Sequence, residues 1–199
     1  MKSIGTQSVT KFYVVWRGRK PGVYNNWSDC QMQVKKFSGA KFKSFATEDE
    51  AITAFYNNPI KTSEIPLPNS YAVDASCIGG NPGTIEYQCV SVQNRVRIFK
   101  SKQYSNGTSN IGEFLGIVHA LAFFQKRGDE TVIYSDSINA LTWLQNGRCN
   151  SQVKLSADDP LSNLIKRANI WLANNQYRSQ VLFWDNRIWG ENPADYGRK

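Results

Sequence analysis

Short runs rich in aromatic and β-branched residues alternate with polar turns in the first quarter of the chain, a pattern typical of β-strands. These runs predict strands at Lys11–Trp16, Val23–Tyr24 and Lys41–Phe45. Two capping-box pairs, in which a Ser or Thr precedes a Gln or Glu on the first turn, predict helix starts at Ser28–Gln31 and Thr47–Glu50. The pattern therefore predicts a small ββαβα unit over residues 11–57.

A proline-rich stretch without usable periodicity follows at residues 58–69 and predicts a short, stiff linker. From residue 70 to residue 199, apolar runs and helical stripes alternate as in an α/β domain. Strands are expected at 71–77, 84–92, 95–104, 131–135 and 180–184, and helices at 110–126, 138–145 and 159–174. The first three strands are expected to be antiparallel and the fourth to be of the buried parallel type. This domain is therefore expected to form a mixed five-stranded sheet flanked by helices.

Composition narrows the classes of function. The 199 residues carry a net charge of +8, which favours a polyanionic partner such as nucleic acid, although a merely solvated basic surface explains the charge equally well. No apolar run approaches the ~20 residues of a membrane span, and the N-terminus lacks the apolar block of a signal peptide. A cytoplasmic protein is expected. Four scattered cysteines and a single histidine argue against a zinc site.

Carboxylates occupy the ends and centres of expected elements. Asp74 lies in the middle of the first strand of the larger domain, Glu113 in the first turns of its first helix, and Asp136 directly after the fourth strand. Apolar neighbours surround each of them, and an unpaired charge in such surroundings is costly. Divalent cations with a preference for oxygen ligands, such as Mg²⁺, would relieve that cost. Any one of these residues could be an ordinary surface acid, or a helix N-cap in the case of Asp136, but their joint occurrence favours a metal site.

The first unit resembles a known domain. It contains Trp-Arg-Gly-Arg-Lys, Gly-Val-Tyr, Trp-Ser-Asp-Cys and Lys-Phe-Lys-Ser-Phe, and it looks like the hybrid-binding domain found at the N-terminus of many type 1 ribonucleases H. The resemblance implies that Trp27 and Phe42 pack on the DNA strand of an RNA/DNA hybrid and that Lys43 contacts its phosphates. Ser44 stands where the family usually has a second basic residue.

The larger domain carries four further motifs: Val-Asp-Ala-Ser, Thr-Ser-Asn-Ile-Gly-Glu-Phe, Ile-Tyr-Ser-Asp-Ser and Trp-Gly-Glu-Asn-Pro-Ala-Asp. They resemble the blocks of a type 1 ribonuclease H, most closely the bacterial enzymes that have the N-terminal hybrid-binding domain. In that family each block supplies one metal-binding carboxylate. The resemblance places these carboxylates at Asp74, Glu113, Asp136 and Asp195.

The resemblance implies an endonuclease that hydrolyses the RNA strand of RNA/DNA hybrids and leaves 5′-phosphate and 3′-hydroxyl ends. Two Mg²⁺ ions about 4 Å apart, with Mn²⁺ as a substitute, would straddle the scissile phosphate, and Asp74 would bridge them. Asn81 and Asn110 would contact 2′-hydroxyls, which DNA lacks, and Thr108 a DNA phosphate. A monomer is implied, with double-stranded RNA as a weaker partner and no membrane association.

The chain departs from the common family pattern at several positions. Many members have a mobile histidine before the last aspartate, whereas this chain has Glu191 there, to which we assign metal exchange and product release. The only histidine, His119, is expected to have a packing role. Ser109 replaces the first residue of a common Asn pair, and Ile138 replaces a polar residue that often contacts RNA.

A lysine-rich helical protrusion that some relatives use to hold the duplex is also absent, and the N-terminal domain is expected to supply that grip instead. Two alternatives stay open: a DNA-acting nuclease or transposase-like enzyme on the same scaffold, and a non-catalytic module that keeps the fold.

Overall fold

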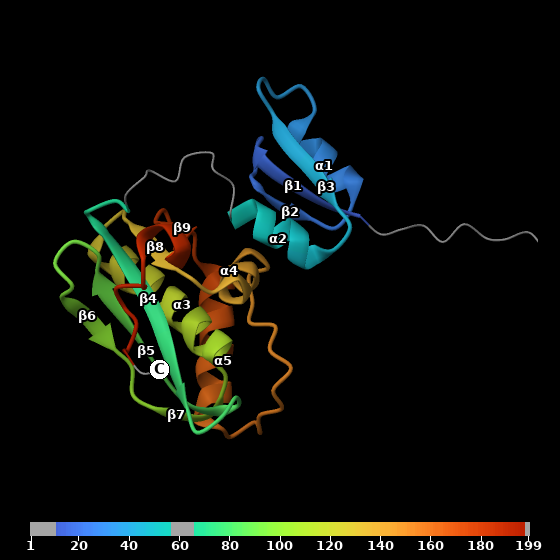
Figure 1. Cartoon of the computed structure of the whole chain (residues 1–199). Coiled ribbons are helices and arrows are strands. Elements are labelled where there is room, and N and C mark those ends of the chain that lie inside the picture. The colour runs from blue at the N-terminus through green and yellow to red at the C-terminus, as the bar shows by residue number, and fades with distance from the viewer. Residues whose placement is uncertain (1–10, 57–65, 198–199) are drawn as a thin grey trace, which may run out of the picture. The chain divides into compact units, whose positions relative to one another are not determined.

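The computed structural model describes residues 11–56 and 66–197 (Figure 1). The chain divides into two compact units, with the boundary between residues 62 and 63. Most of the predicted linker, residues 58–65, and the last residue of the predicted first domain lie outside the described residues.

The N-terminal unit has the predicted ββαβα order. Its elements are β1 (Phe12–Arg17), β2 (Gly22–Tyr24), α1 (Trp27–Val34), β3 (Lys41–Phe45) and α2 (Glu48–Tyr56). The three strands form an antiparallel sheet in the order β2-β1-β3. Val15 of β1 packs with Cys30 and Val34 of α1. On α2, Ala51 and Ile52 are buried.

One predicted helix start in this unit is confirmed and the other is wrong. Glu50 accepts from the backbone N–H of Thr47 at 3.4 Å and donates its own N–H to the Thr47 hydroxyl at 3.2 Å, which is a capping box. At α1 the cap is Asn26 instead of Ser28. The Asn26 side chain accepts from the Asp29 N–H at 2.9 Å and donates to the Asp29 carboxylate at 2.8 Å, and this reciprocal pair starts the helix two residues earlier.

The C-terminal unit is built on one mixed sheet (Figure 1). Its strands are β4 (Ser70–Ile78), β5 (Gly83–Ser91), β6 (Arg97–Lys100), β7 (Tyr104–Gly107), β8 (Val132–Ser135) and β9 (Gln180–Phe183). The order is β6-β5-β4-β8-β9, and β7 pairs with β5. Strands β4, β6 and β7 each pair antiparallel with β5, whereas β8 pairs in parallel with both β4 and β9. The predicted fold class, a mixed sheet flanked by helices after a small ββαβα unit, is confirmed.

The third predicted strand, 95–104, is two strands, so the sheet has six strands rather than five. The break lies at Ser101, whose hydroxyl accepts from the backbone N–H of Tyr87 at 2.9 Å while its own N–H donates to the Tyr87 carbonyl at 2.8 Å. The Ser101 hydroxyl thus accepts from the Tyr87 N–H, which in a regular strand pair would donate to a backbone carbonyl. The pairing with β5 is irregular on both sides of this point.

The helices of this unit are α3 (Ser109–Arg127), α4 (Ile138–Gln145), α5 (Pro160–Asn174) and α6 (Asn186–Trp189). The predicted apolar stripe of α3 is buried: Phe114, Ile117, Val118, Leu121 and Phe124. Helix α3 packs mainly on β4 and β5, as Figure 1 shows. The four-residue α6 was not predicted, although Asp185 caps it by accepting from the Arg187 N–H at 3.0 Å.

All four cysteines are free thiols. Within the described residues, no helix has both the length and the apolar character needed to cross a bilayer.

Candidate active site

Two of the predicted carboxylates lie level with one another on neighbouring parallel strands. Asp74 is at the centre of β4, and Asp136 is the residue after β8. In the β4–β8 register Ala72 is opposite Tyr134, so Asp74 and Asp136 follow two residues later on each chain. The parallel pairing therefore brings these two acids side by side where β8 ends.

A close approach of α3 to β4 brings in Glu113. A Cβ atom added to Gly112 would lie 2.6 Å from the Cβ of Ala75, so only glycine fits between the helix and the strand at this point. Glu113 is the next residue of α3, and Ala75 follows Asp74 in β4. The contact of α3 with β4 therefore sets the Glu113 carboxylate beside the Asp74 carboxylate.

Nearby negative charges perturb Asp74 and Glu113. Burial, then the negative charges of Asp136 and Asp195, raises the pKa of Asp74 to about 7. Burial and the charges of Asp136 and Asp74 also raise the pKa of Glu113 well above its ordinary value. The Oε2 atom of Glu113 is buried and accepts no hydrogen bond. Partly buried carboxylates close to further negative charges, one of them with an unpartnered oxygen, are an arrangement that a cation would stabilise.

The fourth carboxylate, Asp195, lies on irregular backbone after α6, and its charge acts on Asp74. Two asparagines hold Asp136 in place: Asn186 donates to its Oδ2 at 2.9 Å, and Asn192 donates to its Oδ1 at 3.0 Å. Sequence reasoning missed both asparagines, because their spacing to Asp136 becomes meaningful only after the chain folds. Glu191 is exposed on the same segment, directly after the C-cap of α6.

The donor set fits a hard divalent cation. Asp74, Glu113, Asp136 and Asp195 offer only carboxylate oxygens, the ligands that Mg²⁺ prefers, and Mg²⁺ retains several waters and so needs few protein ligands. As they stand, no three His, Cys, Asp or Glu side chains among the described residues are arranged closely enough to enclose an ion by themselves. The orphaned oxygen of Glu113 is the observation that favours a cation here.

The residues predicted to contact the hybrid in the C-terminal unit, Asn81 and Asn110 for RNA and Thr108 for a DNA phosphate, line one groove of about 710 Å³. Asn81, Thr108 and Asn110 lie in it, together with residues that sequence reasoning had not selected: Asn139, Trp143 and residues 150–154. Thr108 also caps α3 by accepting from the Ile111 N–H at 3.3 Å. The groove therefore combines side-chain amides and hydroxyls with one indole ring.

The N-terminal unit brings together two of its three predicted contact residues. Trp27 of α1 and Phe42 of β3 are 41% and 45% exposed, and their ring centres are 5.6 Å apart. Tyr13, which the sequence had not singled out, extends the cluster at 5.4 Å from Trp27. Lys43 points to the other face of β3, where its ammonium lies 5.4 Å from the Phe45 ring centre. It does not adjoin the aromatic pair.

The only histidine has the packing role that was expected. The His119 ring stacks on Phe99 with ring centres 3.9 Å apart and meets the edge of Tyr87. Burial lowers the pKa of His119. The stacked imidazole on the middle of α3 is part of the contact of this helix with β5 and β6.

Comparison with known proteins identifies the N-terminal unit. Residues 11–55 match the family model of the Ribonuclease H1 N-terminal domain. Over 47 residues the chain is 53% identical to human Ribonuclease H1, a match that covers 24% of this chain and 16% of the human protein. Over 52 residues it is 40% identical to Ribonuclease H of Saccharomyces cerevisiae, which covers 26% of this chain and 15% of that protein. These matches span far less than two thirds of either relative.

Solved structures also resemble the chain. One is RNase H1 of the archaeon Halobacterium salinarum, with 18% identity, a TM-score of 0.37 and coverage of 59% of this chain and 86% of that one. Another is LC11-RNase H1 in complex with an RNA/DNA hybrid, with 20% identity, a TM-score of 0.34 and coverage of 57% and 81%. TM-scores this low do not assign an activity to the chain. The sequence matches confirm the predicted resemblance of the N-terminal unit to the N-terminal domain of Ribonuclease H1.

Proposed function

We propose that this protein is an endoribonuclease that hydrolyses the RNA strand of RNA/DNA hybrids. One observation carries the proposal: the partly buried Asp74 and Glu113 both lie close enough to Asp136 for its charge to raise their pKa, in a chain whose first unit matches the Ribonuclease H1 N-terminal domain. Either feature alone would fit other classes of protein. Together they favour metal-dependent cleavage of a hybrid duplex.

Asp74, Glu113, Asp136 and Asp195 would hold two Mg²⁺ ions, with Mn²⁺ as a substitute. Bound there, the ions would activate a water and stabilise the departing oxygen of the scissile phosphate. Asp74 is the best candidate for a shared ligand, because both its neighbours Asp136 and Asp195 act on its charge. The attacking water forms a bond to phosphorus as the bond to the 3′-oxygen breaks, which leaves a 5′-phosphate and a 3′-hydroxyl.

Other residues near the carboxylates would serve turnover and selectivity. Glu191 is exposed at the start of the segment that leads to Asp195, a position suited to exchange of ions and release of product. Asn81 and Asn110 line the groove with amide groups that can pair with 2′-hydroxyls, and Thr108 offers a hydroxyl to a DNA phosphate. The indole of Trp143 in the same groove suits stacking against a sugar or base.

The N-terminal unit would bind the hybrid independently of the cut. Its exposed pair, Trp27 and Phe42, offers two adjacent ring faces to the sugars or bases of the DNA strand. Lys43 lies on the other face of β3, so it would reach phosphates only around the edge of that strand. RNA/DNA hybrid is the proposed partner, double-stranded RNA a weaker one, and the active form is proposed to be a monomer.

A cleavage assay on strand-labelled duplexes tests this function. We expect the wild-type protein with Mg²⁺ to cut the RNA strand of a hybrid and to leave a DNA/DNA duplex of the same sequence intact, and EDTA should abolish cleavage. Asp136→Asn should be inactive. Asp158→Asn, which removes an exposed acid elsewhere on the unit, should cut normally. Cleavage of the DNA duplex would favour the DNA-acting alternative, and full activity of Asp136→Asn would contradict the assigned site.

A further inference from the structure

Asp195 differs from the other three carboxylates in what supports it. Asp74 is part of β4, Glu113 is part of α3, and Asp136 directly follows β8, so a regular element fixes each backbone. The described residues after α6, 190–197, contain no helix or strand. The position of Asp195 must therefore come from side chains that hold this segment to the sheet.

Asn192 attaches the segment to the sheet on the β8 side. Its side chain is 4% exposed, and its amide nitrogen donates both to the Val73 carbonyl and to Asp136 Oδ1, each at 3.0 Å. Its amide oxygen accepts from the Ala194 N–H at 2.9 Å. The backbone N–H of Asp195 in turn donates to the Asn192 carbonyl at 2.9 Å. Both N–H donors of the Asn192 amide are thus used, one on the Val73 carbonyl of β4 and one on Asp136.

The place that Asn192 fills is one that the sheet leaves open. The parallel ladder between β4 and β8 ends at Ala72 and Tyr134, because the chain turns into α4 after Ser135. The next carbonyl of β4 is that of Val73, the residue before Asp74. Asn192 donates to this carbonyl and so takes over the role of the missing strand neighbour.

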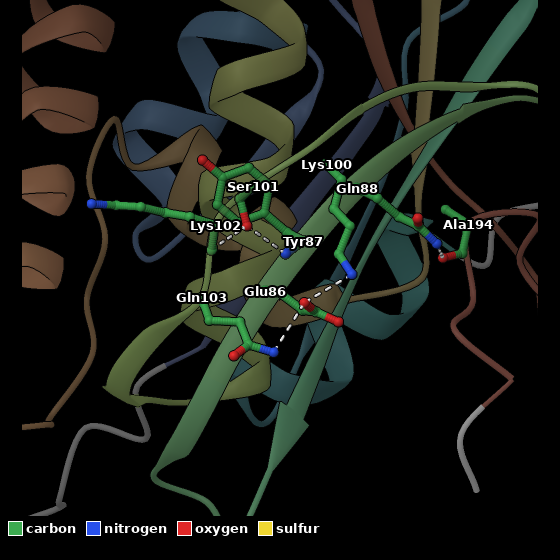
Figure 2. A network of polar contacts seen from close by, with 8 residues as sticks. All are labelled: Glu86, Tyr87, Gln88, Lys100, Ser101, Lys102, Gln103 and Ala194. Carbon is green, nitrogen blue, oxygen red and sulfur yellow. Dashed lines mark hydrogen bonds and ion pairs between the residues drawn. The ribbon is translucent and has the colours of Figure 1, made fainter.

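Gln88 attaches the segment on the β5 side. It lies directly opposite Asp74 in the β4–β5 register, it is 6% exposed, and its amide donates to the Ala194 carbonyl at 2.7 Å (Figure 2). Figure 2 also shows Lys100 reaching Glu86, at 2.9 Å. The same ammonium lies 5.3 Å from the ring centre of Tyr196. The residues on both sides of Asp195 are therefore tied to β5 and β6.

We infer that Asn192 and Gln88 form an amide clamp that positions Asp195 and orients Asp136 for ion binding. They are positioning residues, since neither has a carboxylate for the ion and each acts through Asp136 or Asp195. Asn192 reaches both acids at once, one through its side chain and one through its backbone carbonyl. This inference rests on the proposed function.

Ion binding measured without turnover tests the clamp. Mg²⁺ is titrated into full-length protein, and the rise in melting temperature gives the concentration for half-maximal stabilisation. We expect Asn192→Ser to raise that concentration about 10- to 100-fold, the range for loss of a group that orients a metal ligand. Gln88→Met, which keeps the volume of the side chain, should raise it severalfold. Asn175→Ser removes a comparable 2.9 Å amide–carbonyl bond at the end of α5 and should leave it unchanged.

Hybrid cleavage supplies a second readout. In Asn192→Ser the turnover number at low Mg²⁺ should fall and should recover as Mg²⁺ is raised, while KM for the hybrid stays constant. If Asn192→Ser does not fold, Gln88→Met carries the same comparison. A half-maximal Mg²⁺ concentration equal to that of the wild type, with only a lower metal-free melting temperature, would reduce both residues to a structural role and overturn the inference. A wild-type protein that neither responds to Mg²⁺ nor cuts the hybrid would refute the proposed function itself.

Discussion

Asp74→Asn should stabilise the metal-free protein, and only at neutral or alkaline pH. Burial and the charges of Asp136 and Asp195 raise the pKa of Asp74 from 3.8 to about 7 in the folded chain. An acid with a raised pKa binds its proton more tightly when folded. The folded state therefore carries no penalty below pH 4, loses stability as the pH rises through 4 to 7, and carries the full penalty above pH 7.

The size of the penalty follows from the shift. A pKa change of one unit corresponds to about 1.4 kcal/mol, so a shift of roughly 3 units costs about 4 kcal/mol at pH 8. Asparagine has nearly the same shape as a protonated aspartate and carries no charge at any pH. With about 3 °C per kcal/mol for a unit of this size, Asp74→Asn should raise the melting temperature by about 12 °C at pH 8.

Differential scanning calorimetry in EDTA at pH 4 and pH 8 measures this effect. At pH 4 the melting temperatures of the variant and the wild type should differ by no more than about 2 °C, because Asp74 is protonated in the folded chain and only about half ionised in the unfolded chain. Asp158→Asn, an exposed acid with the same change in charge, serves as the control and should shift neither transition. An equal stabilisation by Asp74→Asn at both pH values, or a loss of stability at pH 8, would refute the argument that Asp74 is electrostatically strained.

Two further predictions concern packing and hybrid binding. Gly112→Ala should destabilise the C-terminal unit by about 1–3 kcal/mol and lower the turnover number, because the new methyl group would push Glu113 and α3 away from Ala75. Gly116→Ala on the same helix meets its neighbours at 3.6 Å and should instead be neutral or stabilise by up to about 1 kcal/mol in a thermal melt. Trp27→Ala should raise KM for the hybrid about tenfold in steady-state kinetics with little change in turnover number. Met32→Ala, which changes another exposed residue of α1, should leave KM unchanged. An unchanged KM for Trp27→Ala would contradict the binding role of the N-terminal unit.

Local sequence patterns predicted most of the regular elements, because these depend on periodicity and capping. The helix expected at 138–145 begins and ends at those residues, and α3 differs from its expected range by one residue at each end. The break in the third strand was missed because it depends on the Ser101 hydroxyl reaching Tyr87 across the sheet. No pattern within either strand signals that contact.

The candidate site was predictable only in part, because some of its residues stand out in the local sequence and others do not. Asp74, Glu113 and Asp136 stand out because apolar residues of identifiable elements surround them. Asp195 has no such setting and was found only through the family resemblance. Asn192 and Gln88 could not be found locally, since an amide becomes a clamp only when the folded chain brings it to an unpaired carbonyl and a carboxylate.

The group of four carboxylates is the centre of this account. Anomalous diffraction from crystals with Mn²⁺ tests it most directly. Two crystals are compared: the wild type soaked with Mn²⁺, and the inactive Asp136→Asn variant grown with Mn²⁺ and a bound hybrid. We predict anomalous peaks in the wild type beside the carboxylates of Asp74, Glu113, Asp136 and Asp195, with at least one peak lost or weakened in Asp136→Asn. Wild-type crystals that show Mn²⁺ bound elsewhere on the chain, with these four side chains free of any ion, would contradict the account.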